Sequence, residues 1–118
     1  MTRARSKSEA QGRRAEAIAA WYLRLKGWRI LAQRIRVHGG EVDLIARRGR
    51  TLAFVEVKWR SSQQALDHAI DAHRLRRVVT AAQYLAPKYV KNGEISRIDV
   101  ILLAPGRWPH HLANVWLG

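Results

Sequence analysis

The sequence lacks cysteine and is poor in acidic residues, and each shortage excludes a class of protein. None of its 118 residues is cysteine, which excludes disulfide bridges, thiolate zinc sites and cysteine nucleophiles. Nowhere do 18 apolar residues run together, so we expect no membrane-spanning helix. The basic N-terminus has no apolar segment behind it, and we therefore expect a cytoplasmic protein without a targeting signal.

The scarcity of aspartate and glutamate leaves a large positive charge. Nine acidic residues stand against 22 lysines and arginines, so the formal net charge is +13. Cationic side chains that neutralise phosphates release condensed counterions, which makes such a charge typical of nucleic-acid-binding proteins. A basic surface kept only for solubility is a weaker interpretation, because the charges repel one another. We expect DNA as the partner, ahead of an anionic membrane surface.

Length and hydrophobic content indicate one folded unit. The chain is 47% hydrophobic and long enough for one core but not for two. We expect a flexible basic arm over residues 1–7 and a single domain over residues 8–118. The expected elements are a helix from a capping box at Ser6 to a C-cap at Gly27, strands at 28–37, 41–46 and 51–59, a helix from Asp71 to Pro87, and strands at 95–103 and 112–117.

This order, α-β-β-β-α-β-β, predicts an α/β (α+β) fold with a mixed β-sheet flanked by helices. Side chains alternate along a strand, so Glu56 and Lys58 should share a face with Leu52 and Phe54. Asp43 lies on the preceding strand, and it converges on Glu56 if both acids occupy the same face. Two such carboxylates suit Mg²⁺ or Mn²⁺, which can activate water for phosphodiester hydrolysis beside a lysine.

Each candidate also has a plain structural interpretation. Asp43, Glu56 and Lys58 could form ordinary salt bridges on an exposed sheet, but their apolar neighbours make exposure of the whole face unfavourable. Glu16 lies at the edge of the apolar stripe of the first helix, and a surface charge and a metal site are equally good interpretations there. For Asp99 we favour a salt bridge with Arg97 over a catalytic role.

The run GGEVDLIARRGRTLAFVEVKWR resembles the core of the YraN-like family of the PD-(D/E)xK nuclease superfamily, which is similar to archaeal Holliday-junction resolvases. GRRAEAIAAWYL resembles the first helix of the family, RIDVILL its later strand and HLANVWL its C-terminal segment. The resemblance implies a restriction-endonuclease-like core. It also implies that Asp43 and Glu56 are metal ligands and Lys58 the catalytic lysine, with Glu16 a further acid beside the metal and Glu41 the acid of the family's GE pair.

Two positions depart from the family pattern. Ala32-Gln33 stands where the family usually has asparagine, and His73-Arg74 stands where it often has lysine. The five histidines have no recognisable metal spacing, so they are interpreted as surface or substrate-contacting residues. Among the tryptophans, Trp21 and Trp28 are predicted in the core, whereas Trp59 and Trp108 could stack on bases.

Charge and resemblance together predict a Mg²⁺- or Mn²⁺-dependent endonuclease that hydrolyses DNA and prefers branched substrates. A non-catalytic nucleic-acid-binding protein is the alternative, and a basic accessory protein is a third interpretation. A four-way DNA junction has two-fold symmetry, which a homodimer would match. The turn at 47–50 is predicted to lie next to the metal site. The expected phosphate contacts are Arg34, Arg36, Arg47, Arg48, Arg50, Arg60, Arg74, Arg76 and Arg77.

Overall fold

The computed structural model describes residues 3–61 and 72–116. The predicted order α-β-β-β-α-β-β is confirmed. The predicted start of the second helix at Asp71 and most of the segment before it, residues 61–70, lie outside the described residues. Neither described helix is long and apolar enough to cross a membrane. The elements are α1 (Arg3–Leu25), β1 (Arg29–Val37), β2 (Gly40–Arg48), β3 (Thr51–Trp59), α3 (Ala72–Tyr89), β4 (Ile95–Leu103) and β5 (His110–Leu112).

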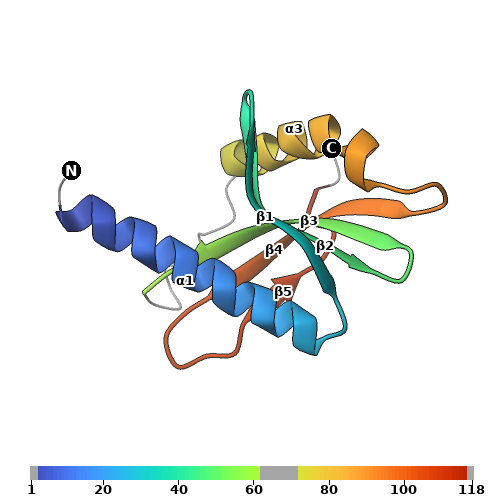
Figure 1. The fold of residues 1–118 in the computed structure, drawn as a ribbon. Coiled ribbons are helices and arrows are strands. Elements are labelled where there is room, and N and C mark those ends of the chain that lie inside the picture. Colours follow the sequence, from blue (N-terminus) through green and yellow to red (C-terminus); the bar gives the residue numbers. More distant parts are fainter. Residues whose placement is uncertain (1–2, 62–71, 117–118) are drawn as a thin grey trace.

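The five strands form one mixed sheet in the order β1-β2-β3-β4-β5 (Figure 1). The first three strands form an antiparallel meander, and β5 is antiparallel to β4. Between them, β3 and β4 run parallel, with Thr51 opposite Ile95 and Trp59 opposite Leu103. Parallel neighbours need a long crossover connection, and α3 lies within it. The mixed sheet flanked by helices is thus confirmed.

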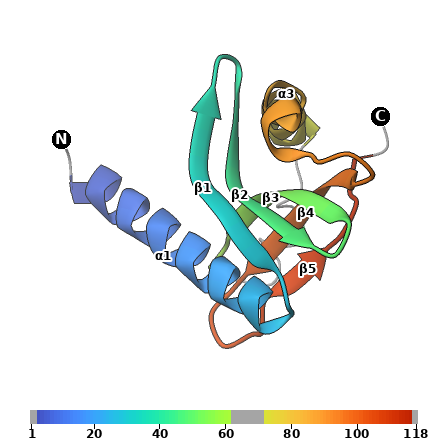
Figure 2. The ribbon, with the colours of Figure 1, turned by 45° about the vertical axis from the view of Figure 1, so that its right-hand side comes forward.

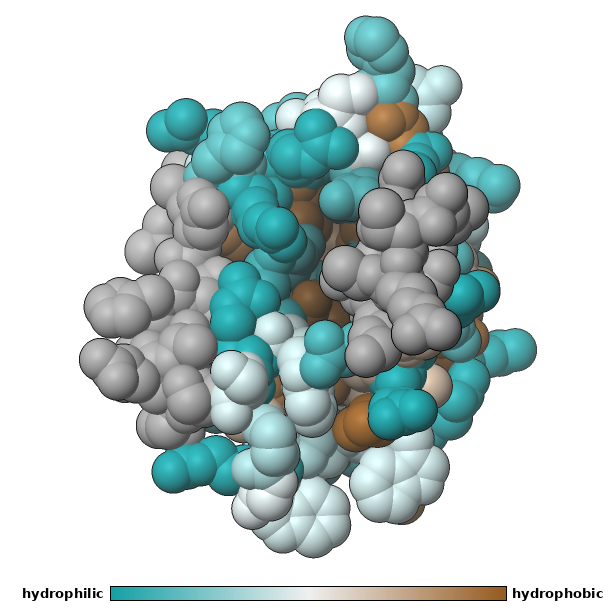
Figure 3. Space-filling view, turned by 90° about the vertical axis from the view of Figure 1, so that its left-hand side faces the viewer, coloured by the Kyte–Doolittle hydropathy of each residue, from teal (hydrophilic) through white to brown (hydrophobic). Residues whose placement is uncertain are grey.

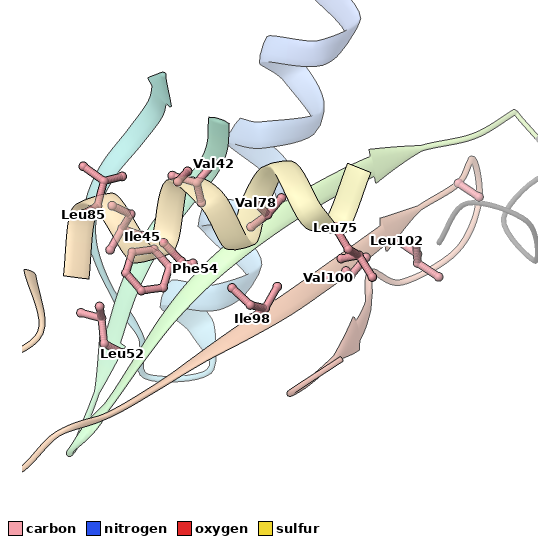
Figure 4. Close-up of a cluster of buried hydrophobic side chains, with 13 residues drawn as sticks. Val42, Ile45, Leu52, Phe54, Leu75, Val78, Leu85, Ile98, Val100 and Leu102 are labelled. Carbon is pink, nitrogen blue, oxygen red and sulfur yellow. The ribbon is translucent and has the colours of Figure 1, made fainter. Parts of the chain in front are cut away.

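The two helices cover opposite faces of the sheet (Figure 2). On one face, Ala19 and Leu23 of α1 pack with Leu44 and Val55. On the other face, α3 covers a second cluster that contains ten large side chains labelled in Figure 4. That cluster comprises Val42, Ile45, Leu52, Phe54, Leu75, Val78, Leu85, Ile98, Val100 and Leu102, with three alanines between them. The alternation of β3 decides which side chains face which helix.

The ends of both helices differ in part from the prediction. Residues 3–7, predicted as a flexible arm, belong to α1, which begins at Arg3 and has no glycine or proline before Gly12. The C-cap at Gly27 is confirmed: its φ is 90°, and the Trp28 and Gly27 amides donate to the carbonyls of Leu23 and Arg24. Pro87 does not end α3, which continues to Tyr89, because a proline in the last turn removes only one late hydrogen bond.

The last strand and one tryptophan also correct the prediction. The final strand is β5 at His110–Leu112, not 112–117, because Asn114 adopts a φ of 55° that ends the extended chain. Trp28 is buried as predicted. Trp21, predicted in the core, is 51% exposed, since α1 turns Ala19, Ala20 and Leu23 toward the sheet instead.

Candidate active site

Asp43 lies where β2 and β3 separate. The paired residues of these strands end at Leu44 opposite Val55, and Asp43 is the next residue along β2. Beyond that point the backbone N–H of Val57 donates to Asp43 Oδ2 at 2.7 Å instead of to a strand carbonyl. The side chain therefore completes the hydrogen bonding of a backbone group that the diverging strands leave without a partner.

Glu56 and Lys58 lie on the same face of β3 as Leu52 and Phe54, as predicted from the alternation. Only 7% of Glu56 and 3% of Lys58 is exposed. Lys58 Nζ lies 2.5 Å from Glu56 Oε1, but the geometry is not that of a hydrogen bond, and the buried ammonium has no hydrogen-bond partner among the described residues. The two charges compensate each other, but burying such a pair away from water is costly, which is more typical of a functional site than of an ordinary surface salt bridge.

Glu16 approaches the same place from α1. The residue is 7% exposed, and Arg34 Nε lies 3.2 Å from its Oε1. That oxygen also has no hydrogen-bond partner in the part of the chain that the structure describes. Burial raises the pKa of Glu16 above its usual value, Arg34 opposes this effect, and Glu41 and Glu56 add to it. The helix therefore turns Glu16 away from solvent and toward the other acids. Glu16, Glu41, Asp43 and Glu56 are called the acidic cluster below.

Burial and the neighbouring acids raise the pKa of Asp43. Burial is the largest cause that raises its pKa to about 7, and repulsion from Glu56 is the second. The Val57 amide lowers the pKa, Glu16 raises it and Lys58 lowers it, so all these groups lie within electrostatic reach. Asp43 and Glu56, which were predicted to converge, thus interact electrostatically, and Glu16 and Lys58 affect the pKa of the same carboxyl group.

This donor set has the chemistry that a hard divalent cation prefers. Asp43, Glu56 and Glu16 offer carboxylate oxygens, and Glu16 Oε1 is buried without a hydrogen bond. Within the described residues, however, no three acidic or histidine side chains stand close enough to hold a metal in their present rotamers. The reason lies in their partners: Glu56 faces Lys58, Glu16 faces Arg34, and Asp43 accepts the Val57 amide.

A cleft of about 370 Å³ opens beside these acids. Its walls are formed by Glu41 and Glu56 from the sheet and by His73, Arg74 and Arg77 from the first turns of α3. The face seen in Figure 3 carries hydrophilic side chains around a recess in which hydrophobic residues are visible. Two of the predicted phosphate contacts, Arg74 and Arg77, therefore border the acidic cluster.

Three other predicted phosphate contacts lie far from this cleft. Arg47 pairs with Glu94 at 2.6 Å and donates to the Tyr89 carbonyl, so it ties β2 to the end of α3. Arg48 donates to the Lys26 carbonyl and stacks on Trp28. The turn at 47–50, predicted to lie next to the metal site, is at the opposite end of the hairpin from Asp43, about 17 Å away for five residues of strand.

The remaining predicted contacts occupy several places. Arg36 is 82% exposed and lies 3.6 Å from Glu41, so it flanks the acidic cluster on its outer side. Arg60 is the first residue after β3, two positions beyond Lys58, and its guanidinium donates to the Trp59 carbonyl. Arg76 is exposed on α3, and Arg50 is exposed in the β2–β3 turn.

Gly40 is a structural residue that the sequence analysis missed. It was interpreted only as part of a turn, but its Cα lies against α3. An added Cβ would come 2.4 Å from the Arg77 carbonyl oxygen and 2.8 Å from the Ala81 nitrogen. The close contact places the β1–β2 hairpin, and with it Glu41, against the arginines of α3. The sequence signal for this contact is the second glycine after Gly39, since the turn alone requires only one.

Asp99 belongs to a separate cluster. The predicted salt bridge with Arg97 is confirmed at 3.0 Å, and Asp99 is fully buried. Its carboxylate also accepts the Asn114 amide at 2.9 Å and lies 2.7 Å from His111 Nε2. Burial would raise the pKa of Asp99, but the bonds from His111, Asn114 and Arg97 outweigh it and hold the pKa below its usual value. The cluster fixes the C-terminal segment to β4, so His111 is structural rather than substrate-contacting.

The sequence pattern of the uncharacterised protein family UPF0102 matches residues 15–103, which include every residue of the acidic cluster. The chain belongs to this family. A UPF0102 protein of Sphingopyxis alaskensis is 62% identical over 112 residues, covering 95% of this chain and 97% of the relative. One from Rhizorhabdus wittichii is 59% identical over 114 residues, covering 97% of each. The resemblance to the YraN-like family is thereby confirmed.

The fold also matches a solved nuclease structure. Hjc, a Holliday junction resolvase from Archaeoglobus fulgidus, superimposes with a TM-score of 0.58 over 85% of this chain and 73% of the resolvase. Sequence identity is 20%, so the likeness concerns the fold. The expected nuclease-like fold is confirmed for this UPF0102 member.

Proposed function

We propose that this UPF0102 protein is a metal-dependent endonuclease that hydrolyses phosphodiester bonds in DNA. The observation that carries the proposal is the grouping of half-buried Asp43 with buried Glu56 and Lys58 at the point where β2 and β3 separate. A buried ion pair between Lys58 and Glu56 and a carboxyl group with a pKa near 7 are costly for stability, and such costs are typical of catalytic sites.

Asp43, Glu56 and Glu16 would supply the carboxylate oxygens for a Mg²⁺ or Mn²⁺ ion. When bound, the ion would supply positive charge to the scissile phosphate and lower the pKa of a water molecule. Lys58 cannot ligate a metal while it carries a proton. It would instead place its ammonium beside the reacting phosphate, where it orients the water or stabilises the growing negative charge. The Val57 amide holds Asp43 in position throughout.

DNA would enter along the cleft between the sheet and α3. Arg74 and Arg77 line this cleft, Arg36 flanks it, and Arg13 and Arg14 are exposed on α1 within one turn of Glu16. Together these side chains can neutralise phosphates on both sides of the acids. The net charge of +13 supports the same partner.

The structural neighbour suggests a substrate class. Hjc is described as a Holliday junction resolvase, and we propose by analogy that branched DNA is preferred over linear duplex. A four-way junction has two-fold symmetry, which a homodimer would match. Competition of unlabelled junction against labelled duplex, with sedimentation of the free protein and the complex, tests both parts of this proposal.

One observation favours a second candidate function, a nucleic-acid-binding protein that does not cleave. In the described residues the acids are paired with Lys58 and Arg34 and do not form a ready three-ligand metal site. Such pairing would persist if the site were purely structural. The two functions differ in whether a divalent cation binds to the protein and whether DNA is cut.

A cleavage assay decides between them. Single-stranded, duplex, flap and four-way DNA are incubated with Mg²⁺, with Mn²⁺ and with chelator. We expect metal-dependent cleavage that Glu56→Gln abolishes, because the amide cannot replace the carboxylate as a ligand. The circular dichroism spectrum of Glu56→Gln, compared with that of the wild type, serves as the control for folding. DNA binding without cleavage on all four substrates would support the non-catalytic candidate.

A further inference from the structure

Arg34 has an unusual backbone conformation at the edge of the acidic cluster. Its φ is 53°, and in the described part of the chain Asn114 is the other non-glycine residue with positive φ. The flanking pairs Gln33–Leu44 and Ile35–Val42 place Arg34 opposite Asp43 in the β1–β2 hairpin. A non-glycine residue in this region is strained, and strain of this kind gathers at functional sites.

The strained backbone directs the guanidinium into the acids. Arg34 Nε lies 3.2 Å from Glu16 Oε1, and Arg34 lines a small cavity of about 40 Å³ together with Glu16, Glu41 and Asp43. Figure 2 shows the β1–β2 hairpin rising between α1, which carries Glu16, and α3. The guanidinium is thus paired with Glu16, a carboxylate that a metal would also use.

In the Arg34–Glu16 salt bridge, the arginine side chain is much more exposed than the glutamate. The Arg34 side chain is 43% exposed, whereas that of Glu16 is 10% exposed, and Glu16 Oε1 accepts no hydrogen bond from the described residues. The guanidinium can therefore swing into solvent, while Glu16 stays in the cluster. A well-made structural salt bridge would have hydrogen-bond geometry, as the pair Arg47–Glu94 does.

We propose that Arg34 is an exchangeable counter-ion of the acidic site. It neutralises Glu16 in the metal-free protein, and a divalent cation displaces it toward the substrate, where its guanidinium binds a phosphate. The inference rests on the proposed metal-dependent function. It assigns Arg34 as the residue that links metal binding to DNA binding. A divalent cation among the acids repels the guanidinium, and a DNA phosphate outside the cluster offers it a new partner.

The first test is calorimetric titration of the DNA-free protein with Mn²⁺. Arg34→Gly removes the guanidinium and fits a φ of 53° without strain, so it should fold. We expect Arg34→Gly to bind Mn²⁺ about 3- to 10-fold more tightly than the wild type, because the competing cation is gone. Arg34→Lys, which keeps a charge at this position, should bind Mn²⁺ more weakly than Arg34→Gly.

The matched control is Arg29→Ala, which removes the same charge from the same strand about 17 Å away. Its Mn²⁺ affinity should stay within about twofold of the wild type, since exposed charges at that distance are screened. If Mn²⁺ affinity rose equally in Arg29→Ala and Arg34→Gly, the effect would come from the net charge of the protein, and the proposal would be overturned.

The second test is DNA affinity in chelator and in Ca²⁺, measured by fluorescence anisotropy of a labelled duplex. Ca²⁺ should tighten DNA binding by the wild type, and the ratio of the affinity in Ca²⁺ to the affinity in chelator should be much smaller for Arg34→Gly. If wild-type protein binds no Mn²⁺, the proposed function itself fails. If it binds Mn²⁺ but Arg34→Gly binds no more tightly, only the counter-ion role of Arg34 is refuted.

Discussion

Replacing Asp43 with asparagine should stabilise the protein near pH 8. In the folded chain burial and repulsion from Glu56 raise the pKa of Asp43 from 3.8 to about 7. Ionised Asp43 therefore destabilises the folded state. For an acid with a raised pKa this cost is absent below the unfolded value, grows as the pH rises through the interval, and is complete above pH 7.

The magnitude follows from the size of the shift. About three pKa units at 1.36 kcal/mol each correspond to about 4 kcal/mol near pH 8 and to less than about 2 kcal/mol near pH 5. Asparagine keeps an oxygen that can accept the Val57 amide, but a neutral acceptor weakens this bond by about 1 kcal/mol. We expect Asp43→Asn to be more stable than the wild type by about 3 kcal/mol near pH 8 and by about 1 kcal/mol or less near pH 5.

Urea unfolding at both pH values, with a chelator present, measures these differences. Asp99→Asn is the matched control, since the pKa of Asp99 is lowered by His111, Asn114 and Arg97 against the effect of burial. This variant should be less stable than the wild type near pH 8. Added Mn²⁺ should raise the melting temperature of the wild type and leave that of Asp43→Asn unchanged. A loss of stability in Asp43→Asn near pH 8, or a gain that does not shrink toward pH 5, would refute the reasoning.

Three further predictions address catalysis, packing and DNA binding. Lys58→Ala should still bind Mn²⁺ and DNA but cleave a substrate of the wild type about 100-fold more slowly or worse, and an unchanged rate would remove Lys58 from the mechanism. Gly40→Ala should lower stability by about 1–3 kcal/mol in urea unfolding because its Cβ meets α3, whereas Gly12→Ala, in open space, should raise it slightly. Combined Arg74→Ala and Arg77→Ala should reduce the log–log salt slope of DNA affinity by about 2, and an unaltered slope would place the DNA elsewhere.

The amino-acid sequence by itself determined most of the secondary structure and the identity of the acidic cluster. Apolar alternation from Thr51 to Trp59 predicted the bounds of β3, and it predicted which face carries Glu56 and Lys58. Glycine at position 27 predicted the end of α1. Local patterns suffice here because strand alternation and helix caps depend on neighbouring residues.

The positions of the arginines were decided only by the tertiary structure. All nine looked equivalent as phosphate contacts, but Arg47 binds Glu94 and the Tyr89 carbonyl at the end of α3, and Arg34 pairs with Glu16. A charged side chain takes the partner that folding brings within reach, and in these pairs the partner lies 18 or more residues away in the chain. Sequence patterns carry no information on such pairings unless the strand register is known.

The same reason explains the short final strand and the role of Gly40. Leu112 pairs with Val100 because Asp99, fully buried on β4, binds His111 and the Asn114 amide and so sets the register of β5. Gly40 is needed because α3 passes within van der Waals distance of the hairpin. Both depend on the packing of segments that are distant in sequence, which hydrophobic periodicity does not encode.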